Sequence, residues 1–159
     1  MIKHIVELIV PNATSEQFYD FMINPIDHQY RQWWDGEHLS FHIVKSGKEN
    51  HLGDIVFMDE HIGANRRLTF FAVVTGANRP NQIVWQMKKF GLRLPAYVEL
   101  NLTDLDNGIL LKHELRIGFL GIGKLLDPIF RIYFNRSFQK SLKEHCEIEW
   151  YRLAEYLKN

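Results

Sequence analysis

The chain has 159 residues, a length that suits one domain. It carries 19 Lys and Arg residues against 19 Asp and Glu residues, and this zero net charge argues against nucleic acid or an anionic membrane as its partner. The single cysteine excludes an intrachain disulfide and suits a reducing compartment. No apolar run reaches the roughly 18 residues that span a bilayer. We therefore expect a cytoplasmic protein with one domain over residues 1–159.

The first part of the chain is predicted to form a strand followed by two short helices. Loose alternation of β-formers indicates the strand, and helical spacing of aromatic residues indicates the helices. Pro11 ends the strand, Pro25 separates the helices, and Asp35-Gly36 closes the second helix with turn chemistry. The three elements are a strand over Ile2–Val10, a helix from Thr14 or Ser15 to about Asn24, and a helix over about Ile26–Trp34.

The middle of the chain switches to a period of two, which is typical of strands. Six strands are expected, over Leu39–Lys45, Gly53–His61, Arg67–Val74, Ile83–Lys89, about Ala96–Asp104 and Ile109–Ile117. Their connections are short, so sequential strands should be antiparallel neighbours. Asn107-Gly108 between the last two strands is a strong signal for a hairpin.

The stretch Pro128–Lys158 is predicted to form a long amphipathic helix that begins at Asp127-Pro128. Its apolar face comprises Phe134, Phe138, Leu142, Cys146, Leu153, Tyr156 and Leu157. Apolar residues before Tyr133 point in a different direction. We therefore expect a kink, or a separate short helix, near Tyr133 to Arg136.

These elements define an α+β protein with about seven antiparallel strands, two short helices after the first strand and a long C-terminal helix. This order resembles the START-like, or Bet v 1-like, helix-grip superfamily. The resemblance implies a curved sheet that wraps around the long helix and leaves an apolar cavity between sheet and helix. It also implies a hydrophobic or aromatic small molecule as partner, bound by a monomer or homodimer.

His145 and Glu149 are the anomaly in the long helix, because they lie four residues apart on its apolar side. An unpaired buried charge is costly, so both side chains need partners. A His–Glu hydrogen bond would satisfy this need. Imidazole and carboxylate are also ordinary zinc ligands, which raises the question of further ligands from the sheet.

Two residues in the first half of the chain are candidates for those further ligands. Glu60 shares a strand face with Val56 and Met58, although the opposite face of that strand is also apolar and could point inward instead. His38 follows a Trp-rich turn where the chain enters the sheet. His28 lies in the same region and is a rival to His38.

The segments YRQWWDGEH (30–38), GDIVFMDEHIG (53–63) and HCEIEWYRLAEYL (145–157) resemble stretches of the diacetylphloroglucinol and phloretin hydrolases. That START-like family binds zinc through two His and two Glu residues and hydrolyses a carbon–carbon bond to an acyl group. The resemblance implies a Zn²⁺ site and assigns its ligands as His38, Glu60, His145 and Glu149. The implied activity is hydrolysis of an acyl-aromatic ketone.

Such a reaction needs a proton at the ring carbon and water at the carbonyl. Candidate helpers are His113, which shares a strand face with Leu111 and Leu115, and Tyr97 or Glu99. Two other interpretations stay open. One is a non-catalytic carrier of an apolar ligand. The other is a metal-free polyketide cyclase or aromatase that depends on His113 and Glu99.

Overall fold

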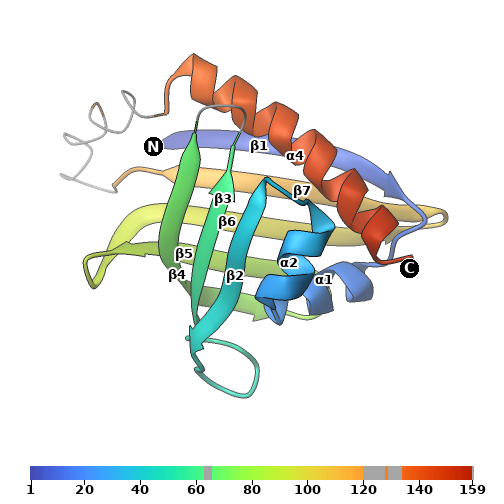
Figure 1. The fold of residues 1–159 in the computed structure, drawn as a ribbon, viewed down its shortest axis with the longest axis horizontal. Coiled ribbons are helices and arrows are strands. Elements are labelled where there is room, and N and C mark those ends of the chain that lie inside the picture. The colour runs from blue at the N-terminus through green and yellow to red at the C-terminus, as the bar shows by residue number, and fades with distance from the viewer. Residues whose placement is uncertain (63–65, 120–127, 129–133, 159) are drawn as a thin grey trace.

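The computed structural model describes residues 1–62, 66–119, 128 and 134–158 (Figure 1). In chain order, the elements are β1 (Ile2–Pro11), α1 (Ser15–Ile23), α2 (Asp27–Trp33), β2 (His38–Lys45), β3 (Ile55–His61), β4 (Arg67–Asn78), β5 (Gln82–Lys89), β6 (Leu92–Leu105), β7 (Gly108–Ile117) and α4 (Arg136–Tyr156). Within the described ranges, no helix combines the length and the apolar character needed to cross a bilayer.

The strands form one antiparallel sheet in the order β1-β7-β6-β5-β4-β3-β2. Register shifts in the β2–β3, β4–β5 and β5–β6 pairs are of the kind that bend and twist strands. The sheet curves, α4 packs across its concave side, and α1 and α2 lie near one end (Figure 1). The predicted α+β helix-grip architecture is confirmed.

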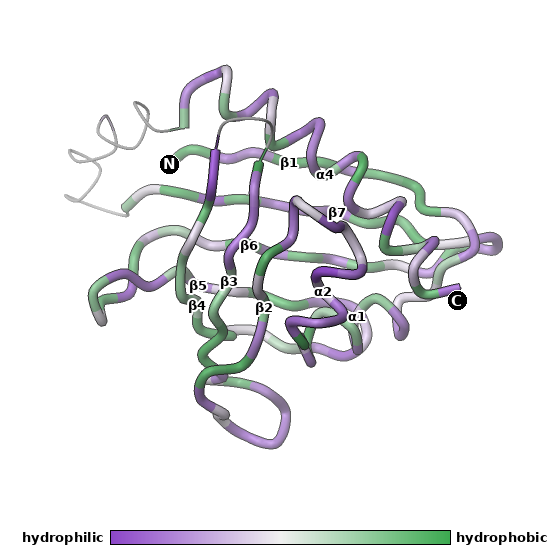
Figure 2. Tube along the Cα trace, in the orientation of Figure 1, coloured by the Kyte–Doolittle hydropathy of each residue, from purple (hydrophilic) through white to green (hydrophobic). Residues whose placement is uncertain are grey.

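The core lies between the concave face of the sheet and α4. Along β6, the inward residues Val98, Leu100 and Leu102 alternate with polar residues that face outward. Figure 2 shows this mixture of hydrophobic and hydrophilic positions along the strands. Since the side-chain period of a strand is two, each strand presents one row of apolar residues to the helix.

Helix α4 starts at Arg136, where the Asn135 side chain accepts a 3.0 Å hydrogen bond from the backbone N–H of Phe138. This cap satisfies one of the free N–H groups at the helix start. The break predicted near Tyr133 to Arg136 coincides with this start. The predicted beginning at Asp127-Pro128 falls largely outside the described residues.

Two hairpins differ from the prediction. Strand β6 begins at Leu92 rather than Ala96, because Phe90-Gly91 closes a two-residue turn and Pro95 falls at a register shift, where proline is tolerated. Gly108 lies in β7, opposite Leu105, rather than at the centre of a turn. A Cβ there would lie 2.2 Å from the Val10 carbonyl oxygen, so glycine allows β1 to approach.

Candidate metal centre

Four buried side chains from three elements converge at one end of the core. His38 begins β2 and pairs in register with Glu60 of β3, while His145 and Glu149 lie one turn apart on α4. One ligand atom from each residue lies within 4.8 Å of the others. The sheet and the long helix therefore bring together the four ligands that the sequence resemblance implied.

A tight turn after α2 sets the position of His38. The Trp34 carbonyl accepts hydrogen bonds from the backbone N–H groups of Glu37 and His38, at 3.2 and 3.0 Å. Gly36 adopts φ = 82°, a conformation that glycine reaches without steric cost. The turn thus delivers His38 into the first position of β2 with its side chain directed inward.

The register of β3 is the one that directs Glu60 inward. Val56, Met58 and Glu60 line the cavity. Asp59 faces the opposite side, where it accepts a 2.8 Å hydrogen bond from Arg67 Nε. The alternative strand face is therefore excluded.

An aromatic shell surrounds the four residues. Tyr30 Oη donates a 2.7 Å hydrogen bond to Glu60, and its ring stacks on His38 at 4.0 Å between centroids. Trp34 stacks on His145 at 4.7 Å. The sequence pattern identified these aromatics as helix markers and as part of the segment that carries the family resemblance, but not as a shell around the four residues. Their place in the segment YRQWWDGEH, immediately before His38, was the available signal for this role.

The two carboxyl groups are short of compensating charge. Burial, followed by the negative charge of Glu149, raises the pKa of Glu60 to about 7. Burial also raises the pKa of Glu149 to about 7, against the opposing effect of His145. Without a cation, both carboxyl groups are therefore partly protonated at neutral pH.

The imidazoles are also held neutral, and the contact between His38 and Glu149 is long, with Nε2 3.5 Å from a carboxylate oxygen. Burial lowers the pKa of His38 to about 4 and lowers the pKa of His145 as well. Both ring nitrogens of His38 and Nε2 of His145 are buried and make no hydrogen bond of normal geometry within the described part of the chain. Two neutral imidazoles and two carboxylates would match a divalent cation such as Zn²⁺ in both charge and ligand type. The residues therefore fit a metal.

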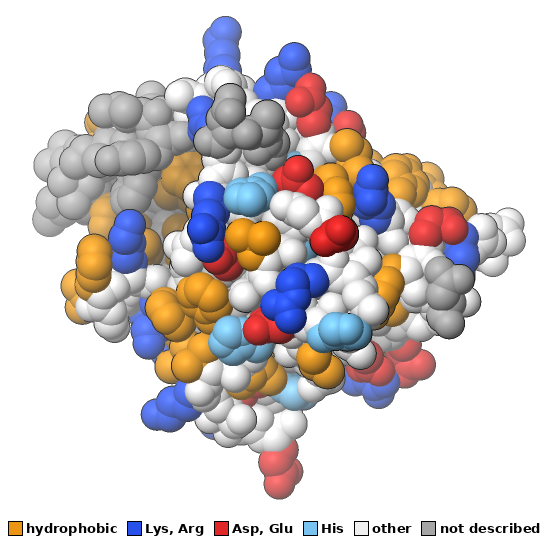
Figure 3. Space-filling model, viewed as in Figure 1, with side chains coloured by type: hydrophobic (Ala, Val, Ile, Leu, Met, Phe, Trp, Pro, Cys, Tyr) orange, Lys and Arg blue, Asp and Glu red, His pale blue; other side chains and the backbone are white. Residues whose placement is uncertain are grey.

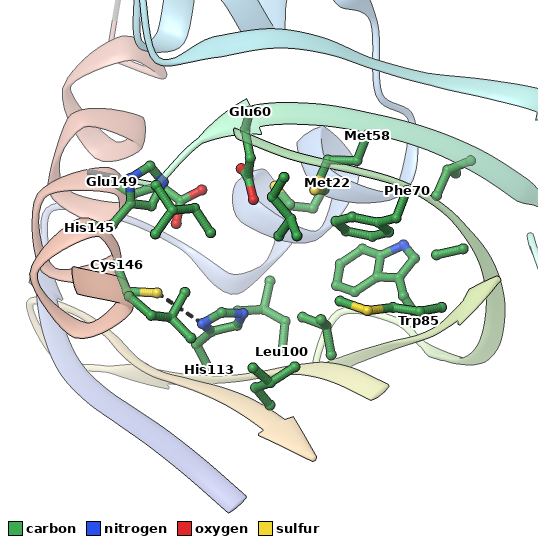
Figure 4. Close-up of a pocket in the computed structure, with 18 of the residues that line it drawn as sticks. Met22, Met58, Glu60, Phe70, Trp85, Leu100, His113, His145, Cys146 and Glu149 are labelled. Carbon is green, nitrogen blue, oxygen red and sulfur yellow. Dashed lines mark hydrogen bonds between the residues drawn. The ribbon is translucent and has the colours of Figure 1, made fainter. Parts of the chain in front are cut away.

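The candidate site opens into an apolar cavity. Figure 4 shows Glu60, His145 and Glu149 at one end of it, and Phe70 and Trp85 at the other. The cavity encloses about 870 Å³ of empty space, including space that is open to solvent.

His113 is the further polar side chain predicted to face the cavity, and it does line it. Its Nδ1 lies 3.1 Å from Cys146 Sγ (Figure 4). Burial lowers the pKa of His113 to about 4, and burial raises the pKa of the Cys146 thiol well above its usual value. A neutral imidazole thus faces a protonated thiol, and the tautomer of His113 decides which of the two donates.

Three sequence candidates lie elsewhere. Tyr97 and Glu99 alternate with the cavity-lining Val98 and point to the convex face, where Tyr97 accepts from Gln86 and Glu99 binds Arg116. The strand period places them on the side opposite His113 and so removes them from the cavity. His28 is exposed on α2 and is not part of the cluster.

No protein-family sequence model matches the chain, and no curated protein sequence does either. Solved structures do match. The KanY protein aligns with a TM-score of 0.64 at 8% identity, over 99% of this chain and 98% of that one. Ginseng major latex-like protein 151 from Panax ginseng aligns at 0.60 and 10% identity, over 91% and 96%. The Aha1 dimer from Colwellia psychrerythraea aligns at 0.52 and 14% identity, over 94% and 98%.

These similarities define the fold class of the chain. The chain has the helix-grip, Bet v 1-like fold. At such low identity the similarities show the fold alone and carry no information on the reaction. A function must therefore be argued from the site.

Proposed function

We propose that this protein binds a zinc ion through His38, Glu60, His145 and Glu149 and hydrolyses an acyl-aromatic ketone bound in the adjoining cavity. The observation that carries the proposal is the convergence of four buried ligand residues at the end of an apolar chamber. In a purely structural His–Glu pair, each side chain would be the other's hydrogen-bond partner. It would not need four such groups with unsatisfied imidazole nitrogens.

The cavity suits an aromatic ligand that carries oxygen atoms. Most of its described lining is aliphatic or aromatic. The indole N–H groups of Trp85 and Trp150 are buried without a hydrogen-bond partner within the described ranges, and both residues line the cavity. Hydroxyl or carbonyl oxygens of a polyketide-like molecule could accept from these donors. A purely aliphatic ligand would leave them unsatisfied.

In the proposed reaction, the bond between the ring carbon and the carbonyl carbon breaks. One water is consumed: its oxygen joins the carbonyl carbon to give a carboxylic acid, and the ring carbon gains a proton. Zinc bound at the site would supply Lewis acidity toward the carbonyl oxygen and a water of lowered pKa. The apolar side chains hold the ring in place and exclude bulk water from the reacting atoms.

His113 serves in this proposal as a hydrogen-bond donor. In this proposal the Cys146 thiol donates to Nδ1, which leaves the proton of the neutral ring on Nε2, the nitrogen directed away from Cys146. The low pKa of His113 makes the imidazolium scarce at neutral pH, so the ring is a poor general acid. The neutral ring can instead donate a hydrogen bond from its Nε2–H group to an oxygen atom of the substrate.

All four ligand residues and the described cavity lining come from one chain, so the proposed activity does not need a second copy. A monomer satisfies this requirement, and so does a homodimer. The buried free thiol of Cys146 is compatible with the cytoplasm.

Metal analysis of protein purified without chelator tests the first half of the proposal. The wild type should carry one zinc per chain, and His145→Ala should lose it. His28→Ala is the matched control, since His28 is an exposed histidine outside the cluster, and it should keep its metal. A wild-type protein without stoichiometric metal would reject the zinc site.

Incubation with an acylphloroglucinol tests the second half, with detection of the free ring and the released acid. Ligand recovered intact from a protein that holds zinc would identify a non-catalytic carrier. Turnover that survives both His145→Ala and Glu149→Gln would instead identify a metal-free enzyme. Circular dichroism of each variant separates loss of the site from loss of the fold.

A further inference from the structure

The tip of the β5–β6 hairpin carries an aromatic residue where its backbone disfavours one. Lys89 pairs with Leu92, so Phe90 and Gly91 are the two central residues of the turn. Both have positive φ, 51° and 79°, as a type I′ turn requires. Asn or Gly is preferred at such a position, and a bulky residue there is strained. Turn formation therefore does not explain Phe90.

Packing does not explain Phe90 either. Its side chain is 91% exposed, the highest value among the exposed large hydrophobic residues of the described chain, and that of Leu92 is 70% exposed. Isolated exposed apolar residues are common, but two at one projecting tip form a contact surface. The tip lies at the end of the molecule away from α1 and α2 (Figure 1).

Three cations lie next to these apolar residues along the hairpin. Lys88 and Arg93 are direct cross-strand partners, a like-charge pair that destabilises a hairpin. Lys89 Nζ lies 5.7 Å from the centre of the Phe90 ring. Among the described residues, none of the three cations forms a salt bridge with a carboxylate. Figure 3 shows basic and hydrophobic side chains side by side over this hairpin.

We propose that this tip, formed by Lys88 to Arg93, docks on the surface of an anionic lipid bilayer. Phe90 and Leu92 enter the boundary between headgroups and acyl chains, and the three cations contact the acidic headgroups. Anionic headgroups would relieve the repulsion between Lys88 and Arg93. The expectation of no membrane partner rested on the net charge of the whole chain, which averages over this local cluster.

A lipid surface fits better than nucleic acid, because strained, solvent-exposed Phe90 gains from an apolar medium and the tip is too narrow to follow a phosphate backbone. The inference does not depend on the zinc site, which lies in the core. Metal content therefore stays unchanged if the docking proposal fails, and docking is unaffected if the metal proposal fails.

Co-sedimentation with two kinds of vesicle tests the proposal, one of phosphatidylcholine and one of an equimolar mixture of phosphatidylcholine and phosphatidylglycerol. The wild type should bind the mixed vesicles and not the neutral ones. Phe90→Asn should weaken binding at least about tenfold, since it removes a buried aromatic contact. Lys89→Gln should weaken it about fivefold.

The choice of Asn separates binding from folding. Asn suits the positive φ at this position, so Phe90→Asn should melt no lower than the wild type. Ile26→Asn is the matched control: Ile26 is 53% exposed at the start of α2, and its replacement should leave vesicle binding unchanged.

Three results would overturn the assignment. The first is a wild type that ignores the mixed vesicles. The second is equal binding by the wild type and Phe90→Asn. The third is a lower sedimentation coefficient of free Phe90→Asn, which would show that the tip holds a second copy of the chain.

Discussion

The Tyr30 hydroxyl donates a 2.7 Å hydrogen bond to Glu60, and the same ring lies parallel to the His38 ring, with 2° between their planes. One side chain from α2 therefore contacts a candidate ligand residue on each of two neighbouring strands. Burial and the nearby carboxylates raise the pKa of Tyr30 well above its usual value. Tyr30 thus stays protonated and acts as a donor that fixes the orientation of Glu60.

Tyr30→Phe should weaken zinc binding about 10–100-fold, the usual effect of removing a partner that orients a metal ligand. The ring stays, so the stack on His38 is kept. A competition titration against a chromophoric chelator measures the change. Tyr151→Phe is the control, because the Tyr151 hydroxyl donates to the Ile9 carbonyl on the surface. Equal affinities for the wild type and Tyr30→Phe would contradict the orienting role.

Gly108→Ala should destabilise the fold by about 2 kcal/mol or more, because the new Cβ would lie 2.2 Å from the Val10 carbonyl oxygen. Gly36→Ala is the control: it also has positive φ, but its added Cβ would meet no heavy atom within 4 Å. We expect it to cost only ~1–2 kcal/mol. Urea unfolding in the presence of chelator measures both. Similar losses would mean that backbone conformation alone explains the effect.

The sequence predicted the order of the elements well, because Pro, Gly and the change of period from two to 3.6 are local signals. It also predicted which residues approach His145 and Glu149, through the helix spacing and the family resemblance. The direction of Glu60 was open, since both faces of β3 carry apolar residues. The structure resolves it through pairing with β2 and β4, which no local pattern encodes.

Two differences between the sequence predictions and the structure have a common physical origin. Tyr97 and Glu99 were candidates because they share β6 with cavity residues, but Val98 and Leu100 occupy the inward positions of that strand. Asn107-Gly108 was interpreted as a turn pair, whereas Gly108 is needed for contact with β1, a strand about 100 residues away in sequence. In both cases, contacts between segments that are distant in sequence determine where the residue lies.

Leu115→Trp should abolish binding of an apolar fluorescent probe in the cavity while leaving the metal content unchanged. Leu115 is buried and lines the cavity beside His113, so the larger ring would occupy the space of the ligand. Leu110→Trp is the control on the same strand, because Leu110 is 38% exposed on the opposite side. Probe binding that survives Leu115→Trp would place the ligand site elsewhere.

Glu149→Gln should stabilise the metal-free protein above neutral pH and have little effect in acid. Burial raises the pKa of Glu149 from 4.5 to about 7 in the folded state. The folded wild type therefore binds more protons than the unfolded chain between these values, and its stability falls as pH rises through about 7. Glutamine stays neutral, so the variant avoids this loss.

The stability difference between Glu149→Gln and the wild type should grow by about 1–3 kcal/mol between about pH 5 and about pH 8. Urea unfolding with chelator at the two pH values measures it. Added zinc should reverse the order, because it stabilises the chain that keeps all four ligands and binds the variant weakly. A difference that is independent of pH would mean that Glu149 is already ionised in the metal-free fold, and would remove the charge deficit from which the cation site is argued.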